Sequence, residues 1–206
     1  MKMTDLLSKN KLLGSPEEDN DKIFNIGMTV LIVIMVLDIL VKMFWLSPVQ
    51  VIGSSMNTTL YNSDILLIDK IKEPETGDIV VIKINSTTNY IKRIIGLPGD
   101  TVYNDAEGNV YRNGVKIDEP YAYYDPARGY GTFGATSYGF VESGKLFSIT
   151  LNDGEFFAMG DNRWNSYDGR AIYARGGDFK TSQILGIVPK WVVNNKKSLV
   201  WLYKLI

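Results

Sequence analysis

Three short stretches of this chain hold the side chains that could do chemistry. The first, at 51–60, contains Ser55, and the second, at 90–100, puts Lys92 among apolar residues. The third, at 160–170, is rich in Asp, Asn, Arg and Ser. A serine hydroxyl becomes a good nucleophile only beside a base, and a lysine amine can be that base once burial has lowered its pKa. The stretches therefore allow nucleophilic catalysis by serine with a lysine base.

Each stretch also has an ordinary structural interpretation when it is taken alone. Ser55 follows a glycine and another serine, a composition typical of turns. Lys92 alternates with apolar neighbours, and simple alternation along a strand would direct it to solvent. Lys92 and Arg93 lie on opposite faces of that strand, however, so one of them is buried if both faces of the sheet are covered. The 160–170 stretch is dense in side chains that hydrogen-bond their own backbone, which is typical of a rigid turn.

The composition excludes the commonest bases for a serine nucleophile. The 206 residues contain neither histidine nor cysteine, so a His-based triad, a thiol nucleophile, a disulfide and a zinc finger are excluded. The 22 basic and 23 acidic residues give a formal charge of −1, without the basic surplus of a nucleic-acid-binding protein. A hydrolase of this composition must use Lys, Asp, Glu or Tyr as its base, and we expect no nucleic-acid partner.

The segments after residue 60 contain the short β-branched runs that predict strands. Asn113-Gly114 supplies the positive φ values of a type I′ hairpin turn within 110–117. The glycine-rich residues 125–145 are predicted to be a long excursion, whereas the apolar end at 199–206 is either a last strand or a second membrane-associating stretch. We predict a mainly β domain over 47–206, with strands in the runs 65–68, 78–84, 90–95, 156–159 and 184–188.

The N-terminal part of the chain predicts a membrane anchor, which we assign to a transmembrane helix over 23–46. The preceding residues are polar, and a helix over the apolar run at 24–46 would extend about 34 Å, enough to cross a hydrocarbon core of about 30 Å. A buried core helix stays open as the alternative, because Asp38 and Lys42 interrupt the run. A cleavable signal peptide fits less well, since the run is long and no A-x-A site follows it.

Basic residues on the two sides of this helix predict its orientation. Four lysines precede it, whereas none occurs between Met43 and Asp69. Under the positive-inside rule, the tail at 1–22 is then cytoplasmic and the domain at 47–206 extracytoplasmic. We therefore expect a single-pass protein of the cell membrane with its β domain outside the cytoplasm.

Together, the three stretches resemble the motifs of type I signal peptidase, the membrane-anchored serine protease that removes signal peptides from exported proteins. Residues 55–60, Ser-Met-x-x-Thr-Leu, look like its nucleophile motif, and residues 92–100 match its general-base motif almost completely. Residues 160–170 resemble the third motif of the family. The order, the spacing, the strand context and the anchor also fit. Gly53, where some relatives have serine, and the short chain resemble the Gram-positive branch.

The resemblance implies a coiled, barrel-like antiparallel β-sheet that carries a Ser–Lys dyad, without a metal ion or another cofactor. Ser55 would be the nucleophile and Lys92 the general base. A hydroxyl at Ser166 would orient the lysine, while Asp168 and Arg170 would brace the loop as an ion pair. The backbone N–H of Ser55 would serve the oxyanion hole.

The resemblance also implies how a substrate binds. Shallow apolar pockets would accept small residues at the first and third positions before the scissile bond, and the extended substrate would add to the sheet as a strand. We expect the signal peptides of preproteins and the lipid bilayer as partners. We also expect a monomer, and an association with the secretion or pilus assembly machinery stays open. The predicted pocket residues are Val49, Val51, Met56, Leu60, Tyr90 and Ile91.

Two departures from the family pattern keep alternatives open. The family usually has proline at the position of Thr58, and an acidic or amide residue is commoner at the position of Trp164. A divergent member dedicated to pilin or surface-protein assembly, even a non-proteolytic chaperone, is the main alternative, although retention of both Ser55 and Lys92 argues against lost activity. A self-cleaving repressor with the same dyad would need a DNA-binding helix-turn-helix where this chain has its apolar run.

Overall fold

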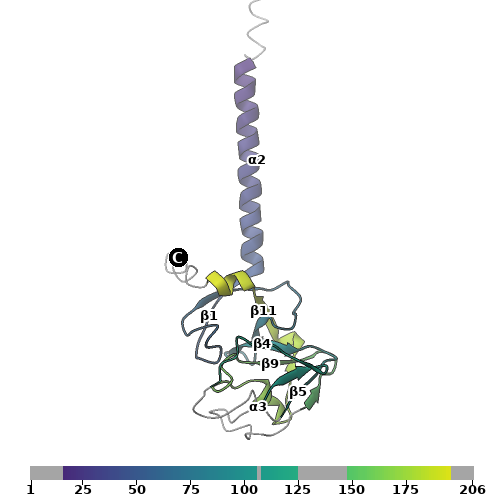
Figure 1. Cartoon of the computed structure of the whole chain (residues 1–206). Coiled ribbons are helices and arrows are strands. Elements are labelled where there is room, and N and C mark those ends of the chain that lie inside the picture. Colours follow the sequence, from purple (N-terminus) through teal and green to yellow (C-terminus); the bar gives the residue numbers. More distant parts are fainter. Residues whose placement is uncertain (1–15, 106–107, 125–147, 196–206) are drawn as a thin grey trace, which may run out of the picture. The chain divides into compact units, whose positions relative to one another are not determined.

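The computed structural model describes residues 16–105, 108–124 and 148–195, and the chain divides into two compact units, Met1–Trp45 and Leu46–Ile206 (Figure 1). The described part of the first unit is a helix, and the second unit is mainly β. The predicted excursion at 125–145 and the predicted apolar end at 199–206 lie outside the described residues.

The N-terminal helix α2 (Pro16–Trp45) is long and apolar enough to cross a membrane, and the candidate span within it is Asn20–Val41. None of that span is buried within the protein, which speaks against the alternative of a core helix. The helix begins earlier than the predicted residue 23, and proline suits a first helical turn because its missing N–H has no intrahelical partner there. It ends one residue before the predicted boundary, because Leu46 pairs with Asp69 as the first residue of a strand.

The larger sheet of the second unit has seven strands, and every pair of neighbours is antiparallel. It forms a curled half-barrel, which confirms the predicted mainly β fold. The β-branched runs predicted as strands are all present, whereas the last strand of the sheet, Phe179–Lys180, was not predicted. In spatial order the strands are β1 (Leu46–Gln50), β2 (Ile65–Asp69), β11 (Ile184–Val188), β3 (Ile79–Lys83), β4 (Asn89–Gly96), β9 (Glu155–Met159) and β10 (Phe179–Lys180).

A second sheet has four strands and includes the predicted hairpin. Asn113 and Gly114 form its turn with φ values of 51° and 81°, the positive values that a type I′ turn requires. The spatial order is β7 (Val115–Lys116), β6 (Val110–Arg112), β5 (Thr101–Asn104) and β8 (Ser148–Thr150). Two short helical segments, α3 (Gly169–Tyr173) and η1 (Thr181–Gln183), accompany these strands, and residues 190–195 are also helical.

Strand β3 lies in the interior, because core side chains cover both faces of the sheet at this point. Val80 packs in one core cluster with residues of β9 and β10, and Ile79 packs in another cluster with residues of β2. The neighbouring strand β4 pairs Lys92 with Val80 and Arg93 with Ile79. Both basic side chains are largely withdrawn from solvent, since Lys92 is 3% exposed and the Arg93 side chain 12%. Because both faces of the sheet are covered, the charged forms of Lys92 and Arg93 each require a polar partner.

Candidate active site

The side chains of Ser55 and Lys92 meet, although 37 residues separate them in the sequence. The Lys92 ammonium donates a hydrogen bond to Ser55 Oγ at 2.8 Å and another to the Ile91 carbonyl at 3.0 Å. Its Nζ also lies 5.2 Å from the centre of the Tyr90 ring. Strand β4 supplies the lysine, and the loop that follows β1 supplies the serine. The predicted nucleophile and the predicted base are thus in hydrogen-bonding contact.

The surroundings of Lys92 favour its neutral form. Burial lowers the pKa of this amine to about 8, and Arg170 adds to the effect, whereas Asp168 and Asp161 oppose it. No carboxylate of the described residues forms an ion pair with Lys92. A substantial fraction of the amine is therefore unprotonated near neutral pH, as a general base requires.

The loop that carries Ser55 is fixed by hydrogen bonds within itself and by apolar anchors on either side. Gly53 adopts a φ of 93°, a value that favours glycine, and its N–H donates to Asn62 Oδ1 at 2.9 Å. After the nucleophile, the chain makes a tight turn in which the N–H of Leu60 donates to the Met56 carbonyl at 2.9 Å. Met56 and Leu60 are themselves buried in the core. The nucleophile thus sits on a short, well-anchored turn.

The 160–170 stretch contains a buried ion pair that supports the site from behind. Asp168 and Arg170 approach to 2.8 Å, and their side chains are 0% and 1% exposed. Asp168 also caps the N-terminus of α3 and accepts a hydrogen bond from the N–H of Gly160 at 2.9 Å. Burial opposes the charge of Asp168, but Arg170 and these hydrogen bonds outweigh it, so the pKa of the carboxyl lies below its usual value. The ion pair predicted between these two residues is therefore present.

Ser166 lies in the same place but does not contact the lysine as the resemblance implied. Its hydroxyl is buried and helps to lower the pKa of the nearby Asp168 carboxyl, and no hydrogen bond joins it to Lys92. It packs against Gly160 so closely that a Cβ at that position would collide with it and with the Ser55 carbonyl. Gly160 therefore allows the third stretch to approach the nucleophile, and the Ser166 hydroxyl is held within that crowded space.

A second buried ion pair lies behind the site and was not predicted. On the face of β4 opposite Lys92, Arg93 binds Asp161 at 2.6 Å and stacks 4.0 Å from the centre of the Tyr121 ring. Burial raises the pKa of Tyr121 to about 12. The signal in the sequence was the second basic residue of the strand, but its acidic partner, 68 residues away, could not be chosen from the sequence.

The six predicted pocket residues divide between two core clusters. Five of them belong to or pack against the cluster that contains Met56, whereas Tyr90 packs against a different one. Leu60 is 0% exposed, so it could shape a substrate pocket only from beneath. The partly exposed members of the set are Val49, Tyr90 and Ile91.

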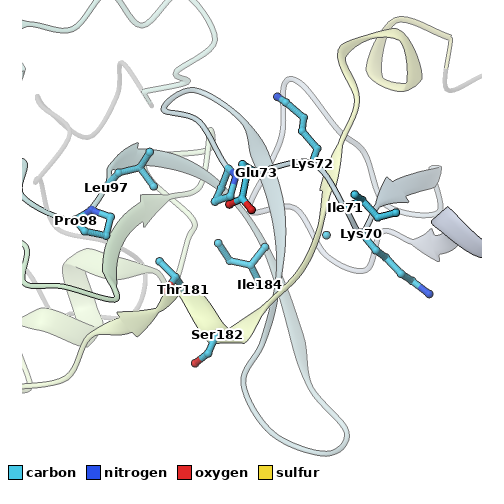
Figure 2. A pocket seen from close by; sticks show the side chains of 11 residues that line it. Lys70, Ile71, Lys72, Glu73, Leu97, Pro98, Thr181, Ser182 and Ile184 are labelled. Carbon is cyan, nitrogen blue, oxygen red and sulfur yellow. The ribbon is translucent and has the colours of Figure 1, made fainter.

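One cavity of about 580 Å³ in the β domain is lined by neither Ser55 nor Lys92. Figure 2 shows that the side chains of Lys70 and Lys72 extend away from it, so their amines do not reach into it. The candidate active site is therefore the buried Ser55–Lys92 contact rather than this cavity. Among the described residues, no group of three acidic side chains could hold a metal ion. The lining of the cavity is Lys70, Ile71, Lys72, Glu73, Pro74, Leu97, Pro98, Thr181, Ser182, Ile184 and Gly186.

The chain is similar to proteins of a known protease family. Residues 23–201 match the family described as "Signal peptidase, peptidase S26", so the protein is a protease. The chain belongs to the signal peptidase family, which cleaves signal peptides from preproteins.

Several relatives are named signal peptidase I. The chain is 38% identical to signal peptidase I S of Bacillus subtilis (strain 168) over 145 residues, which cover 68% of this chain and 74% of that protein. It is 30% identical to signal peptidase I of Pseudomonas aeruginosa over 208 residues, 84% of this chain and 69% of the relative. A crystal structure of a signal peptidase I from Enterococcus faecalis V583 aligns with a TM-score of 0.44 and 27% identity, over 58% of this chain and 99% of that one.

Proposed function

We propose that this signal peptidase cleaves its substrates with Ser55 as nucleophile and Lys92 as general base. The observation that carries the proposal is the 2.8 Å contact between Lys92 Nζ and Ser55 Oγ in a site where the amine is 3% exposed. The absence of histidine from the chain removes the usual base for a serine, so a lysine of lowered pKa is the strongest candidate.

The proposed reaction needs Lys92 in its neutral form. The amine takes the proton of Ser55 as Oγ attacks the scissile carbonyl, and the backbone N–H of Ser55 donates to the developing oxyanion. Protonated Lys92 then gives its proton to the leaving amine, which leaves an acyl-enzyme. Water, deprotonated by Lys92, attacks the acyl group and releases the signal peptide from Ser55. Asp168, Arg170 and Ser166 would support the loop behind this dyad.

The full-length protein in detergent, incubated with a preprotein, tests this role. The wild type should release the mature protein, whereas Ser55→Ala should not. A matched substitution of the exposed Ser182, which lies outside the site, should leave cleavage unchanged. Cleavage by Ser55→Ala at a rate near that of the wild type would refute the proposed nucleophile.

For substrate binding, we propose that an extended segment adds as a strand beside β4. Strand β9 pairs with β4 only from Arg93 onward, so the edge beside Ile91 is available to a substrate in the described part of the chain. Val49 and Ile91 are partly exposed apolar residues that pack on the same core cluster, and we propose that they line shallow pockets for small side chains. The pockets should therefore select small residues at the first and third positions before the scissile bond.

A set of preprotein variants tests that selection. Alanine at the first position before the scissile bond should be cleaved efficiently, whereas leucine or phenylalanine at that position should block cleavage. The same substitutions at the second position serve as the matched control, because alternate side chains of an added strand point away from the sheet face. Efficient cleavage after leucine would contradict the proposed pockets.

For topology, we propose that residues 1–22 are cytoplasmic and that the β domain is extracytoplasmic. The lysine asymmetry across helix α2 supports this orientation. Protease added to intact protoplasts should digest the β domain and leave an N-terminal epitope protected. Digestion of the epitope in intact protoplasts would reverse the orientation.

A further inference from the structure

Asn162 of the third stretch makes two hydrogen bonds to the loop that carries Ser55, which Thr59 also joins to that stretch through Asp161. The backbone N–H of Asn162 donates to the Ser55 carbonyl at 3.0 Å. Its side-chain amide donates to the Ser54 carbonyl at 3.1 Å, across 108 residues of sequence. Two consecutive carbonyls at the nucleophile are therefore held from the same side.

A third contact lies between two side chains, those of Asn165 and Ser54. The Asn165 amide Nδ2 donates to Ser54 Oγ at 2.8 Å. Asn165 is in turn oriented by Asn162, because its backbone N–H donates to Asn162 Oδ1 at 3.1 Å. The three residues thus form a closed ring of hydrogen bonds in which each one contacts the other two.

We propose that Asn165 is a positioning residue that acts through the Ser54 hydroxyl to set the direction of Ser55. This inference rests on the proposed role of Ser55 as nucleophile. Rotation of the peptide between Ser54 and Ser55 would move both Oγ relative to Lys92 and the N–H assigned to the oxyanion. Asn162 holds the Ser55 carbonyl with its backbone N–H and the Ser54 carbonyl with its side-chain amide, and Asn165 in addition binds the Ser54 hydroxyl. A small change in the orientation of a nucleophile lowers kcat, whereas the affinity for substrate is little affected.

Substitutions that remove either half of the side-chain contact test the proposal. Asn165→Leu keeps a similar shape without the donor, and Ser54→Ala removes the acceptor. Each should lower kcat about 5- to 20-fold, as expected for one hydrogen bond, with KM for a peptide substrate unchanged. The double variant should be hardly slower than either single one, because both remove the same contact. Ser54→Thr keeps the hydroxyl and should stay within about twofold of the wild type.

Two further measurements separate positioning from general damage to the fold. The pH midpoint of activity should not move in either variant, because the surroundings of Lys92 are unchanged, and the midpoint of thermal unfolding should fall by only a few degrees at most. Ser182→Ala and Asn195→Leu provide the same chemical changes at exposed positions and should behave as the wild type.

The outcomes distinguish this inference from the proposed function. Wild-type kcat in both Ser54→Ala and Asn165→Leu, beside an inactive Ser55→Ala, would overturn the positioning role and leave the nucleophile in place. Losses of kcat that simply track a fall in the folded fraction, or that add in the double variant, would also overturn it. Turnover by Ser55→Ala would remove the proposed nucleophile, and the positioning role would fall with it.

Discussion

Two lysines of the β domain, Lys92 in β4 and Lys72 between β2 and β3, stand in opposite environments. Lys92 is 3% exposed and contacts a serine hydroxyl and a backbone carbonyl. The Lys72 side chain is 38% exposed and lies 2.7 Å from Asp78, which itself accepts a backbone hydrogen bond from Glu75. The pKa of Lys92 is lowered to about 8 by burial, whereas that of Lys72 is raised, chiefly by its hydrogen bond to Asp78.

The comparison teaches which surroundings make a lysine a base and which make it a structural cation. A carboxylate partner stabilises the ammonium, so Lys72 keeps its proton while it fastens a turn. Burial without such a partner destabilises the ammonium, and only then does the amine become available to take a proton. Lys92 in its charged form therefore lowers the stability of the fold, as expected if its role is the proposed one of general base.

The largest effect should come from exchanging each lysine for arginine. Arginine keeps the charge but cannot give up its proton near neutral pH. Lys92→Arg should lower kcat/KM by a factor of about a thousand or more, whereas Lys72→Arg should cleave the preprotein as the wild type does. Rates of preprotein cleavage by the two full-length variants measure the contrast. Substantial turnover by Lys92→Arg would return this residue to a structural role.

A large loss of stability should follow when the ion pair behind Lys92 is broken. Arg170→Met leaves the buried Asp168 without its cation and should lower the free energy of unfolding by about 3–5 kcal/mol. The exposed pair of Asp178 and Lys180 offers the control, since Asp178→Asn should cost far less. Urea unfolding in detergent, followed by tryptophan fluorescence, compares them. If Arg170→Met fails to fold, Asp168→Asn provides the milder change, and equal losses at the buried and exposed pairs would contradict the expectation.

Replacing Lys92 by an apolar residue should increase the stability of the fold. The folded pKa of Lys92 is about 8 and its usual value 10.5, so charging the buried amine costs about 3 kcal/mol below pH 8. That cost disappears as the pH rises from 8 to 10.5, where the unfolded chain also loses the proton. Lys92→Met should therefore be more stable than the wild type by about 3 kcal/mol at pH 7 and by much less at pH 10.5. A gain that does not change with pH would contradict this cause.

The pH dependence of activity should report the same group. Only the neutral amine of Lys92 can act, so kcat/KM should rise about tenfold for each pH unit up to a midpoint near 8, about a hundredfold from pH 6 to the plateau. Lys72→Met should shift neither the midpoint nor the slope. A flat profile between pH 6 and 8 would mean that another group, or a step other than proton transfer, limits the rate.

Much of the β domain could be predicted from the sequence, because the signals involved act over few residues. The run at 79–82 is β-branched and apolar throughout, and it forms a strand buried on both faces. The Asn113-Gly114 pair forms its hairpin turn because few other residues accept two positive φ values in succession. The apolar run that forms most of helix α2 could be recognised by length and composition alone. Spacing and residue type also singled out Ser55 and Lys92 as candidates.

The other features of the fold and of the site depend on contacts between segments that are distant in the sequence, and local sequence patterns do not specify such contacts. The short strands β5, β8 and β10 have weak signals of their own, and their pairing with neighbouring strands defines them. Lys92 rather than Arg93 lies beside Ser55, and this follows only from how the loop after β1 passes β4, since Arg93 binds Asp161 instead. The contact between Ser54 and Asn165 joins residues 111 positions apart. Only the folded chain brings such groups within hydrogen-bonding distance, because that distance depends on how the whole sheet curls.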